Sequence, residues 1–263
     1  MNFIIDQFRS IHFRGKARLL NIVGPNSGMR VTRIFNSVFE LDLEDFIQRQ
    51  IYLGTFEPYE TRLVKKHLRP GMTFVDVGAN VGYYTALAAM QVAGSGGRVI
   101  AFEPSPYAFD KLNSMVLKNK LEQVTAVRAG LSDKAGRGRL YLGVGFKNHS
   151  PTMVAHDNAA VTEITVLSLD DEVERLGIER IDLIKIDVEG HEPKVLAGAK
   201  RLLREGRIRM ILCEFNEHWL CKSGSSPSRL ADTLREAGFV EADQKFAAGG
   251  LENRFFRLAG SSS

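Results

Sequence analysis

Cysteine is scarce in this sequence, with only Cys213 and Cys221 among 263 residues. Two thiols without metal-ligand spacing exclude a disulfide scaffold, so we expect a reducing compartment and a cytoplasmic protein. Long apolar runs are also missing: no stretch reaches the roughly 18 residues that a transmembrane helix needs. The opening segment MNFIIDQFRS has too short an apolar run for a signal peptide. We therefore expect no membrane span.

The sequence also lacks a large excess of charge of either sign. The chain has 35 Lys and Arg against 31 Asp and Glu, a net charge of +4, and no run of five or six basic residues. We therefore expect a mildly basic, solvated surface and no nucleic-acid partner. The 44% of hydrophobic residues and 25% of charged residues are typical of a globular protein.

From Met72 onward, strand-like and helix-like segments alternate. Strands are predicted at TFVDVGA, RVIAFEP, VTAVRAGLS, IDLIKIDVEG and RMILCEFN, with a late pair near FVEADQKF and NRFFRLA. HEPKVLAGAKRLLREG and SPSRLADTLREAG are predicted helices. This alternation is typical of βαβ units. We therefore expect the α/β class: a doubly wound, mostly parallel seven-stranded sheet with an antiparallel hairpin at one edge.

The first part of the chain follows a different pattern. Phe39, Leu41 and Leu43 alternate with acidic residues, which is the period of a half-buried strand. MRVTRIF is its predicted partner across a turn at Asn36-Ser37, and YETRLVKKHL is a predicted helix. This segment is too short for a confident independent core, so we expect a small β/α cap packed on the main domain. Its hairpin is also a candidate contact for a homodimer.

The predicted division of the chain has three parts. They are the N-terminal cap over residues 1–69, the main domain over residues 70–260 and a tail over residues 261–263.

The segment VDVGANVGYYT predicts a strand, a glycine-containing turn and the start of a helix, an arrangement that commonly holds a nucleotide. A dinucleotide fingerprint would need glycines at positions 78, 80 and 83, but Asn80 and Tyr83 occupy two of them. Asp76 would repel a pyrophosphate and attract a ligand that carries an ammonium and a sulfonium. The turn from Gly78 through Asn80 to Gly82 therefore favours S-adenosylmethionine.

Glu103 ends the second predicted strand, in VIAFEPSP. A carboxylate at this place can accept hydrogen bonds from both ribose hydroxyls of a nucleoside, in either cofactor class. Glu103 therefore supports a nucleoside without choosing its kind, and a nicotinamide-dependent oxidoreductase remains an alternative that Asp76 and Asn80 oppose.

Four strings, FVDVGANVGYYT, VIAFEPSP, ITVLSLDD and IDLIKIDVEGHEPKVLAGA, resemble the FkbM-type methyltransferases, a branch of the class I S-adenosylmethionine-dependent enzymes. The resemblance covers about residues 53–216, with DVEGHE as its most specific string, and GTFEPYE resembles the segment that precedes it in the family. It implies a Rossmann-like fold and O-methylation of a hydroxyl. The acceptor is commonly a sugar in a glycan or glycosylated natural product, and some relatives act on polyketide hydroxyls.

The resemblance also implies positions for the cofactor. The turn over residues 76–82 would hold the methionine end, and Glu103 would hold the ribose. Ser132 and Asp133, at the end of the third predicted strand, would lie near the adenine.

Methyl transfer to a sugar hydroxyl, a very weak acid, needs a base or a metal near the oxygen. Asp187 and Glu189 follow the fourth predicted strand, beside the cofactor crevice. We expect Asp187 to position the hydroxyl and take its proton, with Glu189 as a second candidate. His191 titrates near neutrality and is another candidate base, although a helix N-cap or a buried structural histidine would look the same.

Asp187, Glu189 and Glu214 lie at the ends of neighbouring predicted strands and are candidate oxygen ligands for Mg²⁺. The same carboxylates would also form a proton-accepting cluster without a metal, and both interpretations stay open. The irregular segment over residues 143–161 is a candidate binding loop, and Trp219 is a candidate to stack on a sugar ring.

Two further classes were weighed against O-methylation. A non-catalytic binding protein on the same fold is disfavoured, because it would not be expected to keep costly carboxylates at both sites. N-methyltransferases often carry an Asn/Asp-Pro-Pro-aromatic motif where this chain has DVEG. The sequence therefore predicts transfer of a methyl group to oxygen.

Overall fold

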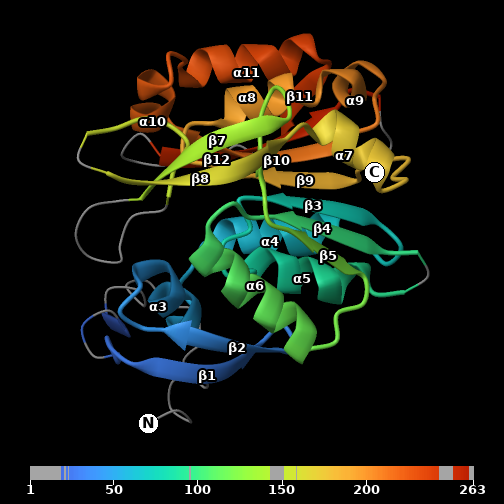
Figure 1. The fold of residues 1–263 in the computed structure, drawn as a ribbon. Helices are drawn as coiled ribbons and strands as arrows, with labels where there is room; N and C mark the ends of the chain where they lie inside the picture. Colours follow the sequence, from blue (N-terminus) through green and yellow to red (C-terminus); the bar gives the residue numbers. More distant parts are fainter. Residues whose placement is uncertain are drawn as a thin grey trace.

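The computed structural model describes residues 19, 20, 22, 24–94, 96–142, 151–157, 159–242 and 251–260. At its centre is a seven-stranded sheet in the order β11-β12-β10-β9-β3-β4-β5 (Figure 1). The strands are β3 (Thr73–Val77), β4 (Arg98–Phe102), β5 (Val124–Val127), β9 (Leu183–Ile186), β10 (Met210–Asn216), β11 (Phe239–Ala242) and β12 (Leu251–Leu258). β12 runs antiparallel to both of its neighbours, and the pairs among β5, β4, β3, β9 and β10 are parallel. The predicted α/β sheet is confirmed.

The predicted antiparallel pair at one edge is also confirmed, with β12 placed inside the sheet and β11 at the edge. Phe255 and Phe256 of β12 are both buried, and they pack into apolar clusters on opposite faces of the sheet. Consecutive buried aromatic residues are expected of an inner strand, because successive side chains point to opposite faces.

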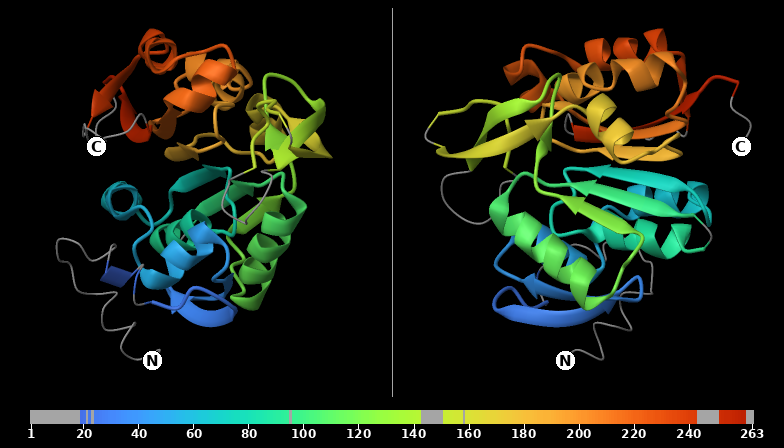
Figure 2. Two further views of the ribbon diagram at one scale, coloured as in Figure 1. Left: turned by 90° about the vertical axis from the view of Figure 1, so that its left-hand side faces the viewer. Right: turned by 45° about the vertical axis from the view of Figure 1, so that its right-hand side comes forward.

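Helices cover both faces of the sheet (Figures 1 and 2). On one side lie α4 (Pro58–His67), α5 (Tyr83–Val92) and α6 (Pro106–Lys118), and on the other lie α7 (Leu169–Arg175), α8 (Glu192–Ala197), α9 (Lys200–Arg204) and α11 (Pro227–Glu236). Phe74 and Val75 of β3 pack into different clusters, so each face of the strand is buried. Every helix in the described residues is too short or too polar to cross a bilayer.

The prediction of one continuous helix over HEPKVLAGAKRLLREG is wrong, because the segment breaks into α8 and α9. Gly198 packs so tightly that a Cβ there would lie 2.0 Å from the Ser132 carbonyl oxygen. The Asp170 carboxylate then accepts the backbone N–H groups of Arg201 (2.9 Å) and Leu202 (3.0 Å), which fixes the start of α9. A packing contact and a side-chain cap from elsewhere in the chain thus override the local periodicity.

The predicted strand VTAVRAGLS also divides. Its first part is β5, and its second part, β6 (Gly130–Leu131), joins a separate three-stranded sheet with β8 (Ala160–Leu167) and β7 (Gly136–Leu142). Within the predicted irregular segment, residues 143–150 and 158 lie outside the described residues. Thr152 forms an antiparallel bridge with Tyr141, and β8 already begins at Ala160, so the end of that segment is strand.

The N-terminal hairpin forms as predicted, from β1 (Met29–Ile34) and β2 (Ser37–Asp42). Its turn lies at Phe35-Asn36, where both φ angles are positive, one residue earlier than predicted. Phe39, Leu41 and Leu43 are buried as expected. The helix α3 (Phe46–Leu53), which begins at the Asp45 cap, was not predicted, whereas α4 was.

The hairpin packs on α6. Phe39 shares an apolar cluster with Leu112 and Met115 of that helix. The Asn119 amide donates to the Val38 carbonyl (2.9 Å), and its oxygen accepts the Val38 N–H (2.7 Å). The N-terminal segment and the sheet domain therefore share one core at this seam.

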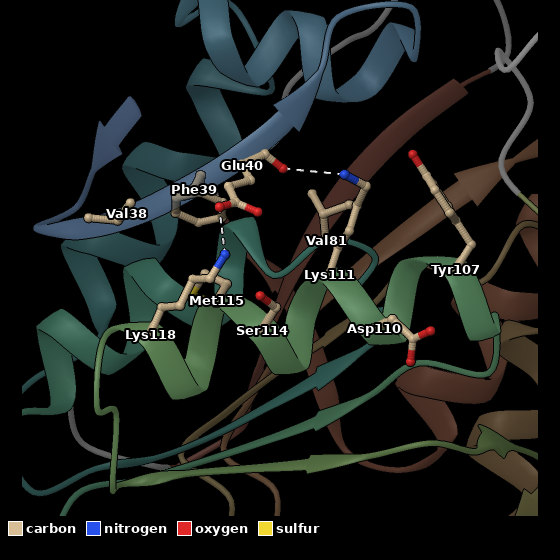
Figure 3. Close-up of a pocket in the computed structure, with 10 residues that line it drawn as sticks. All are labelled: Val38, Phe39, Glu40, Val81, Tyr107, Asp110, Lys111, Ser114, Met115 and Lys118. Atoms are coloured by element: carbon tan, nitrogen blue, oxygen red, sulfur yellow. Dashed lines mark hydrogen bonds and ion pairs between the residues drawn. The ribbon is translucent and has the colours of Figure 1, made fainter. Parts of the chain in front are cut away.

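Charged side chains bridge the same seam (Figure 3). Lys118 pairs with the Glu40 carboxylate at 2.6 Å, and Lys111 donates to the Glu40 carbonyl oxygen at 3.3 Å. A groove of about 270 Å³ runs between β2 and α6 at this place. On β1, Met29 and Val31 are exposed, and the homodimer expected through this hairpin stays a prediction.

Leu41→Ala should lower the free energy of unfolding of the described fold by about 2–5 kcal/mol in a single transition, because the deleted atoms are buried in the shared core. Chemical denaturation followed by fluorescence and circular dichroism measures this. The control Val31→Ala changes a side chain that is 65% exposed and should stay within about 0.5 kcal/mol. A separate early transition that leaves the main one unmoved would show that the cap unfolds independently.

Candidate active site

A cavity of about 400 Å³, which we call the central cavity, lies at the carboxyl ends of β3, β4 and β9. In the strand order, β4 and β5 lie on one side of β3, and β9 and β10 lie on the other side of β3. The strand order therefore reverses between β3 and β9, which is where open α/β sheets bind their ligands.

The turn after β3 forms one wall of this cavity, and glycine is required there. Gly78 has a φ of +82°, and a Cβ on it would lie 1.9 Å from the Asp187 carbonyl oxygen. Its N–H donates to the Phe102 carbonyl at the end of β4 (3.0 Å). Gly82, with a φ of +91°, is pressed against Leu112 of α6. The turn is thus held between the ends of β4 and β9.

Glu103 ties the end of β4 to this turn. One of its carboxylate oxygens accepts the Asn80 N–H and the other accepts the Ser105 N–H, both at 2.8 Å. Burial raises the pKa of Glu103 to about 7, against the lowering effect of these two hydrogen bonds. Because each carboxylate oxygen can accept a second hydrogen bond, Glu103 can still receive the two hydroxyls of a ribose.

Asp76 lies behind the cavity wall. Its Oδ2 accepts the Thr85 hydroxyl proton (2.6 Å), and its buried Oδ1 has no hydrogen-bond partner among the described residues. Burial raises the pKa of Asp76 to about 6. Asp76 does not line the cavity. A role in cofactor binding through its charge, without direct contact, stays a prediction.

A buried lysine organises the far end of the cavity. Lys185 lies 2.5 Å from the Asp187 carboxylate and 4.0 Å from that of Glu57, and its ammonium sits 4.7 Å from the Tyr84 ring centre. Burial alone would lower the pKa of Lys185, but the surrounding carboxylates, foremost Asp187, raise it. Lys185 is therefore a fixed positive charge beneath a group of acids.

Asp187, Glu189 and Glu214 form what we call the carboxylate trio, as the sequence predicted from their strand ends. One oxygen from each lies within 4.8 Å of the others. The Asn216 amide donates to Glu189 at 3.2 Å, whereas the buried Oε2 of Glu214 has no partner among the described residues. Burial, and then the neighbouring acids, raise the pKa of Glu214 well above its usual range.

The DVEGHE string folds into a turn that aims this trio. Glu189 (φ 50°) and Gly190 (φ 92°) adopt left-handed backbone conformations. The buried Glu192 carboxylate accepts the N–H groups of Val188 (3.2 Å) and Gly190 (3.1 Å), and Thr152 donates to the Glu189 carbonyl (2.7 Å). Strand alternation had placed Glu189 on the Asp187 face, but it is this turn that brings it there, because β9 ends at Ile186.

His191, Ser132 and Asp133 come together, but outside the central cavity. The His191 ring lies 3.0 Å from the Ser132 hydroxyl, and Asp133 pairs with Lys194 at 3.4 Å. Burial lowers the pKa of His191 to about 4, which makes it a weak base. The expected roles of His191 as proton acceptor and of Ser132 and Asp133 as contacts of the adenine stay predictions.

Sequence reasoning missed Glu57 and its partner Tyr84, which both line the cavity. The available signal was the GTFEPYE string, which had been matched to the family without a role for its first glutamate. The backbone adds a second signal: Glu57 (φ 36°), Asn80 and Glu189 are non-glycine residues with positive φ, and all three line the cavity. Strained residues of this kind concentrate at functional sites.

The fold and the site together define a class I S-adenosylmethionine-dependent methyltransferase. Residues 76–241 match the Methyltransferase FkbM domain, so the chain belongs to that family. A solved structure of Methyltransferase FkbM from Methylobacillus flagellatus superimposes with a TM-score of 0.50 at 16% identity, over 80% of this chain and 52% of that one. At this identity the likeness shows the fold alone.

Three curated relatives are similar in sequence. Methyltransferase sdnD of Sordaria araneosa is 31% identical over 47% of this chain and 59% of its own length. The 31-O-demethyl-FK506 methyltransferase FkbM of Streptomyces tacrolimicus is 29% identical over 57% and 67%. Hexuronic acid methyltransferase AglP of Haloferax volcanii is 27% identical over 68% and 70%. The matched part of this chain thus spans between about three fifths and 70% of these relatives.

Affinity for S-adenosylmethionine should rise about tenfold as the pH increases from about 5 to about 7, because Asp76 loses its proton near pH 6 and Glu57 and Glu103 are about half ionised at pH 7. Ionised carboxylates attract the cationic ligand, and an α-ammonium stays protonated up to about pH 7.7. Calorimetric titration at constant ionic strength measures the change. Glu103→Gln should flatten the profile, and an affinity that is constant across this range would contradict the assigned charges.

Proposed function

We propose that this chain is an S-adenosylmethionine-dependent O-methyltransferase whose acceptor is a sugar hydroxyl in a glycan or a glycosylated natural product. One observation carries the proposal: a single cavity joins a nucleoside-binding end to an acidic end. The glycine turn and Glu103 lie at the first end, and the carboxylate trio lies at the second. Both groups of residues therefore line one cavity in this arrangement of the sheet.

S-adenosylmethionine supplies a methyl group on a positively charged sulfur, and its transfer to a hydroxyl leaves S-adenosylhomocysteine and one proton. The residues of this chain have two tasks: to hold the hydroxyl in line with the methyl carbon and to accept its proton. Asp187 suits both, because it lines the cavity and Lys185 fixes its carboxylate. Lys185 also offsets the negative charge of the trio.

Two features support a sugar as the acceptor. AglP is by its name a hexuronic acid methyltransferase, and its similarity extends over 68% of this chain. Trp219 lines the same cavity as the trio, and its indole is the aromatic side chain proposed to stack on a sugar ring. A polyketide-type hydroxyl is the second candidate, which the 31-O-demethyl-FK506 methyltransferase favours.

Asp187→Asn should lower kcat about a hundredfold or more and leave the Kd of S-adenosylmethionine within about twofold, because it removes the proton acceptor and keeps the shape. The assay follows S-adenosylhomocysteine release and product mass with hexuronic acid glycosides, neutral hexose glycosides and a macrolide that carries a free hydroxyl. The matched control is Glu217→Gln, which changes an exposed residue of α10 (Glu217–Lys222) outside the cavity. Unchanged turnover in Asp187→Asn would remove Asp187 from the chemistry.

We also propose that the carboxylate trio binds one divalent cation, Mg²⁺ or a larger ion. The donors are all oxygen, and the unpartnered Oε2 of Glu214 is a buried acceptor that a cation would satisfy. The oxygens lie within 4.8 Å of one another, so one divalent cation could contact all three carboxylates. A shared proton on Glu214 is the competing account, and the Asp187–Lys185 pair favours it.

Calorimetric titration with Mg²⁺, Mn²⁺ and Ca²⁺ separates these accounts. The unaltered protein should bind one ion per chain, and Glu214→Gln should weaken that binding about tenfold, because one of three charged ligands is lost. Glu217→Gln again serves as the surface control. Absence of ion binding, or equal binding by Glu214→Gln, would leave the trio as a proton-holding cluster.

A further inference from the structure

Glu57 is an acidic residue of the central cavity that is separate from the carboxylate trio, from the glycine turn and from Glu103. It precedes α4, on the element that follows the N-terminal hairpin, and its φ of 36° and ψ of 61° place it in the left-handed region. Its carboxylate lines the cavity, and 23% of the side chain remains exposed. The backbone is thus held in an unfavourable conformation that presents a carboxylate to the ligand space.

Two neighbours fix the position of this carboxylate. The buried Tyr84 hydroxyl donates to Oε2 at 2.6 Å, and the Lys185 ammonium lies 4.0 Å from the same oxygen. Tyr84 belongs to the first turn of α5, directly after Gly82, so Glu57 lies beside the end of the glycine turn. The other oxygen, Oε1, has no hydrogen-bond partner among the described residues.

The negative charges around Glu57 outnumber the positive charge beside them, so this part of the cavity favours a cationic ligand. Glu57, Asp187 and the buried Asp76 surround a single buried ammonium, that of Lys185. Buried charges of one sign are costly unless they are matched, so a second positive group in this space would stabilise the arrangement. The α-ammonium of S-adenosylmethionine is such a group, and the turn beside Glu57 is the part of the site expected to hold the methionine end.

We propose that Glu57 binds the α-ammonium of the cofactor and that Tyr84 and Lys185 hold its carboxylate in place for this contact. This inference rests on the proposed function, since it assumes S-adenosylmethionine as the ligand. It assigns proton transfer to the trio and cofactor selection to Glu57. The ligand chemistry it requires is a primary ammonium at the amino-acid end of an adenosyl thioether or sulfonium.

The test compares ligands with and without that ammonium. Calorimetry with S-adenosylmethionine, S-adenosylhomocysteine, 5′-methylthioadenosine and a deaminated S-adenosylhomocysteine is carried out on the unaltered protein and on Glu57→Gln. Glutamine keeps an oxygen for the Tyr84 hydroxyl and removes the charge. We expect Glu57→Gln to weaken the first two ligands about tenfold and to leave the last two within about twofold.

Two further variants serve as controls for this result. Glu217→Gln removes an exposed carboxylate of α10 that is outside the cavity lining, and it should change no affinity. Glu103→Gln should weaken all four ligands, because all four carry a ribose. If Glu57→Gln does not fold, the unaltered protein decides: deaminated S-adenosylhomocysteine should bind at least tenfold more weakly than S-adenosylhomocysteine.

Three outcomes would overturn the inference: unchanged S-adenosylmethionine affinity in Glu57→Gln, equal loss of all four ligands in that variant, or equal binding of the deaminated ligand and its parent by the unaltered protein. Unchanged affinity with lost turnover would instead identify Glu57 as a group acting on the acceptor. Failure of the proposed function looks different, because the unaltered protein would then bind neither S-adenosylmethionine nor S-adenosylhomocysteine.

Discussion

The contact between the glycine turn and the end of β9 is the constraint on which the site depends. A Cβ on Gly78 would lie 1.9 Å from the Asp187 carbonyl oxygen, so the turn can approach β9 this closely only with glycine. The same turn is fixed from the other side by the Phe102 carbonyl and the Glu103 carboxylate. One close packing contact thus sets the distance between the Glu103 carboxylate and the end of β9.

The positive charge of Lys185 stabilises the group of carboxylates at the acidic end of the cavity. Several carboxylates share a region of low solvent access, and burial raises the pKa of Glu57, Asp76 and Glu214. A single buried ammonium bonded to Asp187 offsets part of this repulsion, and the rest is relieved either by protons or by a cationic ligand. A sulfonium, an ammonium or a metal ion bound in the cavity would displace protons from these carboxylates. This exchange links cofactor binding to pH.

The sequence predicted the parts of the fold that local chemistry determines. The alternation of strands and helices gave the sheet, and the glycine turn, Glu103 and the trio converge on one cavity because parallel strands end at the same edge. Prediction from the sequence failed where contacts between residues far apart in the chain determine the local structure. The close packing of Gly198 against the Ser132 carbonyl ends a segment that was predicted to continue as one helix. Glu57 was missed because neither periodicity nor spacing distinguishes it from a surface glutamate at a helix start.

The family match begins at residue 76, but some residues that line the central cavity come before that position. Phe46 and Ile51 of α3 and Glu57 before α4 form part of its wall, and the segment that carries them is joined to α6 through a shared core and the Glu40–Lys118 pair. The sheet contributes Glu103 and the carboxylate trio at its strand ends. The N-terminal segment supplies apolar surface and a carboxylate from outside that frame. The wall of the central cavity therefore depends on this segment as well as on the matched domain.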